Sequence, residues 1–210
     1  NRLDYAGQFI WTGVDYIGEP TPWHNQNDTP VKSSYFGIVD TAGIPKNDYY
    51  LYQSQWLELD QHPMVHILPH WNWEIHKSYQ QVVDKYGDIP VRVYSNARSV
   101  ELFLNEKSQG RKTFQEKWTS DGRKYQEGEG SDQLYLEWRL AYQPGELRAV
   151  AYDHQGQLVA EDRVVTAGKP AKIGLHAEKT QLEPDGQDLL YLYFDVLDKD
   201  GNWVPSASNQ

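Results

Sequence analysis

The sequence predicts a mainly β chain: an antiparallel β-sandwich over residues 62–168, preceded by a strand and a helix and followed by the start of a second β unit. Three observations predict this. Short segments that alternate apolar and polar residues recur between residues 64 and 165, separated by turn residues. Residues 47–59 have the apolar spacing of a helix. Residues 189–197 alternate again, beyond a short linker.

The first 61 residues are predicted to contain a buried strand, a long loop, a short strand and a helix. Phe9-Ile10-Trp11 is a short apolar run, which is typical of a strand buried on both faces. The polar stretch 24–34 is predicted to be a loop, residues 35–40 a second short strand, and residues 47–59 the helix. In α/β proteins ligands bind beyond the carboxyl ends of such buried strands, so the loop after Trp11 is the first candidate site.

Residues 64–165 have the pattern of a two-sheet sandwich. The predicted strands are Met64 to Leu68, Val91 to Tyr94, Val100 to Leu104, Ser108 to Phe114, Leu134 to Leu140, Glu146 to Asp153 and Leu158 to Val165. The polar, Gly-rich stretch 115–133 is predicted to be a loop. The predicted inward-facing side chains are Val93, Leu102, Leu104, Leu136, Trp138, Val150 and Tyr152.

Two short segments of the sequence call for a special backbone. Asn105-Glu106 joins two predicted strands, and either Glu106 takes a positive φ or another turn forms. Gly168 and Pro170 suit a short, stiff linker to the last unit. In that unit Leu190, Leu192, Phe194 and Val196 share one face of a strand. A complete sandwich needs about 100 residues, so we expect residues 169–210 to be only its beginning, and the chain to be an internal part of a longer polypeptide.

Composition limits the classes of partner. The net charge of −10 and the pI of about 5.1 argue against nucleic acid. No apolar run approaches the roughly 18 residues of a membrane span, so no membrane partner is expected. There is no Cys, which excludes disulfides, thiol catalysis and Cys-ligated zinc. The compartment stays open, with a periplasmic or extracellular location as the working expectation.

Several blocks of residues match one known family. Trp11 to Pro22 fits the pattern Trp-Thr-Gly-x-Asp-Tyr-x-Gly-Glu-Pro-Thr-Pro, and the blocks 35–40, 43–46, 49–56, 100–105 and 138–147 agree with it. Together they resemble the β-galactosidase branch of glycoside hydrolase family 2. The resemblance implies that residues 1–61 are the eighth strand and helix of a (β/α)8 TIM barrel. It makes residues 62–168 an immunoglobulin-like β-sandwich and residues 169–210 the start of a second one.

The resemblance also implies a function for the intact protein. Family members of this branch are retaining glycosidases that release terminal β-linked galactose, so a β-galactoside is the expected partner, without a cofactor and with a homo-oligomer as a possible assembly. Their two catalytic Glu residues lie on the fourth and seventh barrel strands, upstream of Asn1. No catalytic residue is therefore expected in these 210 residues, and the chain alone is expected to be inactive. The alternatives are a non-catalytic carbohydrate-binding module and a structural spacer.

Three residues are the predicted substrate-binding residues. The resemblance implies that Trp11 forms an apolar floor under the sugar, that the peptide bond after Trp11 is cis, and that Glu19 and Trp23 line the rim of the site. Asp15 is a further carboxylate in the same loop, and we interpret it as structural because it matches no catalytic motif of the family.

The histidines are not predicted to bind metal. His62, His66 and His70 share strand parity, but Pro63 and Pro69 interrupt the segment, so one regular strand that brings all three together is not expected. We interpret them as surface residues or as histidines with ordinary hydrogen-bond partners.

Overall fold

The computed structural model describes residues 7–19, 32–73, 81, 83, 87–129 and 133–207. In these ranges lie α1 (Asn47–Trp56) and eleven strands. The strands are β1 (Val65–Leu68), β2 (Ile89–Ser95), β3 (Ser99–Leu104), β4 (Lys107–Thr113), β5 (Gln115–Trp118), β6 (Lys124–Glu127), β7 (Leu136–Leu140), β8 (Glu146–Tyr152), β9 (Leu158–Val165), β10 (Lys172–Ala177) and β11 (Leu192–Leu197). All the strand pairs are antiparallel, so the predicted mainly β, antiparallel class is confirmed. Within these ranges no helix has the length and apolar content needed to cross a membrane.

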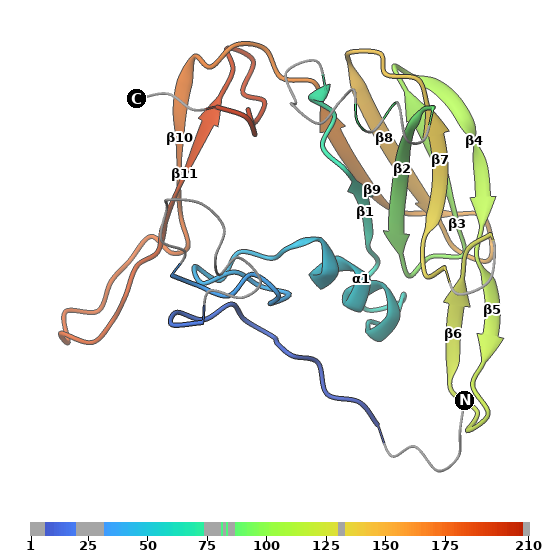
Figure 1. The fold of residues 1–210 in the computed structure, drawn as a ribbon, viewed down its shortest axis with the longest axis horizontal. Helices are drawn as coiled ribbons and strands as arrows, with labels where there is room; N and C mark the ends of the chain where they lie inside the picture. The colour runs from blue at the N-terminus through green and yellow to red at the C-terminus, as the bar shows by residue number, and fades with distance from the viewer. Residues whose placement is uncertain are drawn as a thin grey trace.

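Two sheets face each other and enclose the core (Figure 1). Their strand orders are β1-β2-β7 and β4-β3-β8-β9. The first sheet contributes Val91, Val93 and Leu136 to one buried cluster, and the second contributes Leu102 and Leu147. Each predicted strand of residues 64–165 is present to within two residues at either end. In β2, β3 and β7 the alternation of apolar and polar residues reflects burial on one face, so it predicts these strands.

The prediction for the inner face of β8 is wrong. Val93, Leu102, Leu104, Leu136 and Trp138 are in the core cluster as expected. On β8, however, Leu147, Ala149 and Ala151 face the core, while Val150 and Tyr152 lie on the opposite face. Val150 is buried there as well, and the guanidinium of Arg111 lies 3.6 Å from the ring centroid of Tyr152. Because both faces of β8 are covered, its apolar residues do not alternate cleanly. The size of Val150 and Tyr152 therefore led to the wrong prediction of its inner face.

The stretch predicted as a loop between residues 115 and 133 contains a hairpin. Strands β5 and β6 pair from Gln115 with Glu127 to Trp118 with Lys124, around a turn that contains Gly122. Ion pairs join the strands, with Lys124 Nζ 2.5 Å from Glu116 Oε1. Polar side chains occupy both faces of this hairpin, so its sequence lacks the apolar alternation from which the other strands were predicted.

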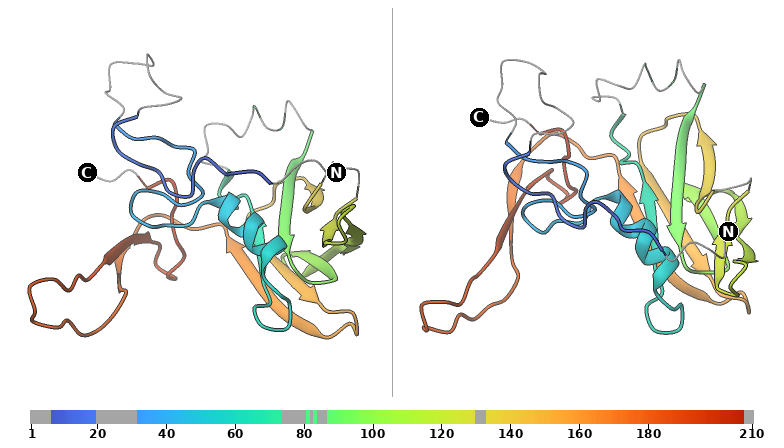
Figure 2. Two further views of the ribbon diagram at one scale, coloured as in Figure 1. Left: turned by 90° about the horizontal axis from the view of Figure 1, so that it is seen from below. Right: turned by 60° about the horizontal axis from the view of Figure 1, so that its bottom comes forward.

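The first apolar run does not form the predicted buried strand. Phe9 is 100% exposed and Trp11 is 75% exposed, and Phe9-Ile10-Trp11 is not a strand. Among the described residues no neighbouring strand pairs with this backbone, so no sheet covers its side chains. Pairing begins just beyond it, in a parallel bridge between Val14 and Val39. In Figures 1 and 2, α1 and the loops that precede it lie between the sandwich and the β10–β11 hairpin.

The last unit is a two-stranded sheet, β10–β11, attached through the predicted linker. The strand expected over 189–197 is present at Leu192–Leu197, and its partner β10 was not predicted. Asp198 joins this unit to the linker, because its carboxylate accepts hydrogen bonds from the backbone N–H groups of Gly168 (2.8 Å) and Asn202 (2.8 Å). These hydrogen bonds hold the pKa of Asp198 well below its usual range, and the bond from Gly168 has the largest effect.

Candidate functional site

The loop after Trp11 forms an exposed cluster of three aromatic rings and a carboxylate, called here the Trp11 cluster: Trp11, Tyr16, Glu19 and Phe36. The indole Nε1 of Trp11 donates to the Tyr16 hydroxyl (3.3 Å), which in turn donates to the Glu19 carboxylate. The rings of Trp11 and Tyr16 meet edge to face at 6.3 Å, and those of Tyr16 and Phe36 at 6.0 Å. The hydrogen bond to Glu19 raises the pKa of Tyr16.

Asp15 holds this loop in place from inside. Its Oδ1 accepts a hydrogen bond from the Gly37 N–H (2.7 Å), and its Oδ2 lies 2.6 Å from Lys46 Nζ. Gly37 is required for this approach, because a Cβ there would lie 2.4 Å from the Asp15 nitrogen. Asp15 is 6% exposed and its carboxylate has partners on both oxygens, which fits the structural role predicted for it.

Backbone hydrogen bonds fix the rest of the loop. The Tyr16 N–H donates to Ser34 Oγ (3.0 Å), and the Ser34 N–H donates to the Tyr16 carbonyl (2.9 Å). The Trp11-Thr12 peptide bond is cis, as the family resemblance implied. The segment after Lys32 therefore supports the loop that presents Trp11.

The structure joins two of the three predicted binding residues. Trp11 and Glu19 are linked through Tyr16, and Trp23 lies outside the described residues. Sequence reasoning did not name Tyr16 or Phe36 as site residues. The available signal was their position, since Tyr16 lies inside the matched motif between Asp15 and Glu19, and Phe36 opens the second matched block.

The Trp11 cluster has the chemistry of a sugar-binding surface. An exposed ring can pack against the C–H face of a pyranose, and a carboxylate can accept hydrogen bonds from its hydroxyls. Hydrolysis requires two carboxyl groups that flank the scissile bond. Asp15 cannot pair with Glu19 in that role, because it is buried in an ion pair with Lys46.

His66 and His70 have partners within the fold. The ring of His66 stacks on Tyr50 at 3.6 Å, and its Nδ1 lies 3.7 Å from Asp162 Oδ2. Burial lowers the pKa of His66, and the charge of Asp162 opposes this shift. His70 Nδ1 accepts a hydrogen bond from the Asn72 N–H (3.2 Å). Across the described ranges, no three His, Cys, Asp or Glu side chains are grouped so as to hold a metal ion.

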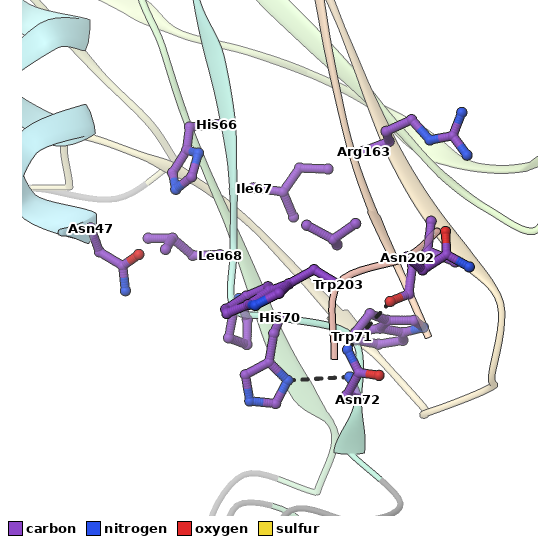
Figure 3. A pocket seen from close by; sticks show the side chains of 13 residues that line it. Asn47, His66, Ile67, Leu68, His70, Trp71, Asn72, Arg163, Asn202 and Trp203 are labelled. Carbon is purple, nitrogen blue, oxygen red and sulfur yellow. Dashed lines mark hydrogen bonds between the residues drawn. The ribbon is translucent and has the colours of Figure 1, made fainter. Parts of the chain in front are cut away.

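A cavity of about 530 Å³ lies apart from the Trp11 cluster (Figure 3). Its walls are the end of β1 and the residues after it, the end of β9, the first turn of α1 and the loop that follows β11. The aromatic and polar side chains that line it include Asn47, His70, Arg163 and Trp203. These residues are more than 150 positions apart at the extremes, so no sequence motif predicted that they would meet.

The comparisons with known proteins agree with the motifs. Residues 87–160 match a family model described as a domain of unknown function (DUF4982). The β-galactosidase BoGH2A of Bacteroides ovatus is 42% identical over 204 residues, which are 97% of this chain and 20% of that protein. A protein of Formosa agariphila, provisionally named a β-glucuronidase, is 34% identical over 98% of this chain and 17% of its own length. The chain thus spans about a fifth of the length of these curated relatives.

Solved structures extend the similarity to the fold. A β-glycosidase from Bacteroides vulgatus superposes with a TM-score of 0.70 and 32% identity, over 95% of this chain and 21% of its own. A glycosyl hydrolase family 2 member from Bacteroides cellulosilyticus gives a TM-score of 0.68 and 28% identity, over 94% of this chain and 26% of its own. Sequence and fold agree along nearly the whole chain, so it is a relative of the glycosidases of glycoside hydrolase family 2.

Proposed function

We propose that this chain is part of a retaining family 2 glycosidase that hydrolyses terminal β-linked galactose. The observation that supports this most is the 42% identity to a β-galactosidase over 97% of the chain. The activity belongs, in this proposal, to the longer polypeptide, since the chain matches only 20% of that relative. The reaction uses two carboxyl groups, and neither family motif that provides them occurs among these 210 residues.

The proposed domain boundaries follow from the same relationship. Residues 1–61 would be the last strand and helix of the catalytic (β/α)8 barrel, residues 62–168 an immunoglobulin-like sandwich, and residues 169–210 the start of a second. The motif at Trp11, the two facing sheets and the two-stranded β10–β11 sheet support this division. In the barrel, further strands would cover Phe9 and Ile10, whose exposure is otherwise costly for apolar side chains.

Trp11 is proposed to position the substrate. Its exposed indole would pack against the C–H face of the sugar, with Glu19 and Trp23 at the rim. The hydrogen bonds from Trp11 to Tyr16 and from Tyr16 to Glu19 support this role, because they fix the ring and the carboxylate relative to each other before a ligand arrives.

A second candidate substrate is a β-glucuronide, favoured by the 34% identity to the Formosa agariphila protein. The two substrates are distinguished by kcat/KM values of the longer polypeptide for 4-nitrophenyl β-D-galactopyranoside and 4-nitrophenyl β-D-glucuronide. We expect the galactoside to be preferred by at least about tenfold, or about 1.4 kcal/mol. Preference for the glucuronide would refute the galactosidase assignment and keep the family.

The 210-residue chain alone is proposed to be inactive. One strand and one helix cannot form the concave site to which eight strand ends contribute. Purified chain at high concentration should therefore leave 4-nitrophenyl β-D-galactopyranoside intact. The control variants are Asp15→Asn and Glu19→Gln. Turnover that either substitution abolishes would contradict both the inactivity and the structural role of Asp15.

One exposed Trp supports the alternative that the sandwich is a carbohydrate-binding module. Trp71, Trp73 and Trp138 are buried, whereas Trp118 on β5 is 61% exposed. A binding module of that kind would therefore use Trp118, and Trp118→Ala would remove its affinity for galactose.

A further inference from the structure

The cavity beside the β10–β11 unit has the composition of a ligand site (Figure 3). Its volume of about 530 Å³ lies within the range of roughly 300–1,000 Å³ that is usual for small-molecule sites. Among the described residues no Asp or Glu lines it, although the chain has 30 acidic residues and a net charge of −10. That lining does not favour a hard divalent cation, for which carboxylate oxygens are common ligands.

Trp203 provides an aromatic face to the cavity. Its side chain is 58% exposed, and it forms no hydrogen bond or ring contact with another residue in the described part of the chain. In Figure 3 its indole lies across the cavity, between Leu68 and Trp71. An exposed indole of this kind presents both an apolar face and an N–H donor to a ligand.

Polar side chains surround this ring. Asn47 projects from the first turn of α1 on one side and Asn202 lies on the other, while the Arg163 guanidinium extends away from the ring (Figure 3). His70 lies below the indole. The Arg163 guanidinium is 2.8 Å from Glu146, so its charge is already paired in the absence of a ligand. Amide groups both donate and accept, as hydroxyl groups do, which suits them to a polyhydroxylated ligand.

Hydrogen bonds connect the walls of the cavity. Asn72 joins two of them, because its Nδ2 donates to the Val165 carbonyl (3.3 Å) and its Oδ1 accepts from the Ala167 N–H (2.8 Å). Asp198 holds the loop of Trp203 against the linker through the Gly168 N–H.

We propose that this cavity binds a pyranose ring, with the indole of Trp203 packed against its C–H face and Asn47 hydrogen-bonded to its hydroxyls. A flat apolar face next to amide groups matches a pyranoside, which has hydroxyls at its edge and C–H groups on its face. The site shares no residue with the Trp11 cluster, so it does not depend on the proposed role of Trp11 in hydrolysis.

The test is a titration of the complete 210-residue chain, labelled with ¹⁵N and followed through the indole N–H signals of its eight Trp residues. The probes are methyl β-D-galactopyranoside, the acidic methyl β-D-glucuronide, and mannitol, an open-chain polyol without a fixed apolar face. We expect a saturable shift of the Trp203 signal with one or both pyranosides, at a Kd on the order of 1 mM, and none with mannitol. Binding of the galactoside alone would identify a neutral sugar as the ligand, and binding of the glucuronide alone an acidic sugar. Binding of both would identify pyranosides of either kind.

Matched variants separate this site from other aromatic surfaces. Trp203→Ala and Asn47→Ala should each weaken binding at least about fivefold, while Trp118→Ala leaves the Kd unchanged. Asn47→Ala tests the site independently of the fold of the Trp203 loop, because Asn47 is exposed and is not the cap of α1. Absence of a saturable shift, an equal response to mannitol, or affinity that survives both Trp203→Ala and Asn47→Ala would overturn the proposal.

Discussion

Two neighbouring residues have a backbone conformation that the sequence predicts only in part. Asn105 and Glu106 both have positive φ, 50° and 62°, in the turn between β3 and β4. For a residue with a side chain this conformation costs about 1–2 kcal/mol. The Asn105 side chain offsets part of the cost, because it donates to the Pro144 carbonyl (3.0 Å) and accepts from the Glu146 N–H (2.9 Å). Glu106 has only an ion pair with Arg148 at 3.2 Å.

Glu106→Gly is therefore expected to stabilise the protein. Glycine adopts positive φ without steric cost, so the free energy of unfolding should rise by about 0.5–1 kcal/mol in urea denaturation. Glu106→Ala is the matched control, because it removes the same exposed ion pair and retains a Cβ at positive φ. If the two variants were equally stable, strain at Glu106 would not be the cause.

The pKa of His66 predicts how stability depends on pH. Because burial lowers that pKa in the folded protein, the unfolded chain binds more protons at this site just below pH 6.5. The contribution of His66 to the free energy of unfolding should be complete above about pH 6.5 and decrease as the pH falls toward the folded pKa.

His66→Phe, which preserves the ring stacked on Tyr50, should flatten this dependence. His62→Gln, at an exposed position, is the control and should leave the pH profile unchanged. Denaturation curves between about pH 5 and 8 measure the effect. An unaltered profile in His66→Phe would show that Asp162, whose charge raises the pKa of His66, offsets its burial.

At the scale of elements, the sequence predicts best the strands that have one face buried in the core. The strands β2, β3 and β7 have one face in the core and were located from alternation alone. β8 is covered on both faces, so its sequence does not show which of its side chains point into the core. The β5–β6 hairpin is polar on both faces, so its sequence predicts a loop. The sequence does not predict β10, because β10 pairs with β11 across a long connection. Hairpins with tight turns can be predicted from their turn residues.

The β10–β11 sheet is expected to be the least stable element of the fold. Its residues Ile173, Leu175 and Phe194 share a face, and Phe194 is 69% exposed. Two strands with an uncovered apolar face are marginally stable in water. Amide hydrogen exchange should accordingly be faster in Leu192–Leu197 than in β3 and β8. Equal protection at dilute concentration would identify β10–β11 as a self-sufficient unit.

At the scale of the whole molecule, the candidate site was predicted in part. The motif from Trp11 to Glu19 identified the exposed ring and the carboxylate, and the hydrogen bonds through Tyr16 were visible only in the structure. Phe36 comes from a segment 20 residues beyond Tyr16, and sequence spacing alone does not place it against that ring. The cavity at Trp203 depends on four separate segments and was not foreseen for the same reason.

We propose that this chain contributes Trp11 to the substrate site of a family 2 glycosidase. The most direct test is the kcat/KM of the longer polypeptide for 4-nitrophenyl β-D-galactopyranoside after Trp11→Ala, with Trp118→Ala as the matched exposed control. We predict a loss of at least about tenfold, or about 1.4 kcal/mol of transition-state stabilisation, in Trp11→Ala alone, with an unchanged Tm. Unchanged kinetics together with a lowered Tm would contradict the claim and make Trp11 a packing residue.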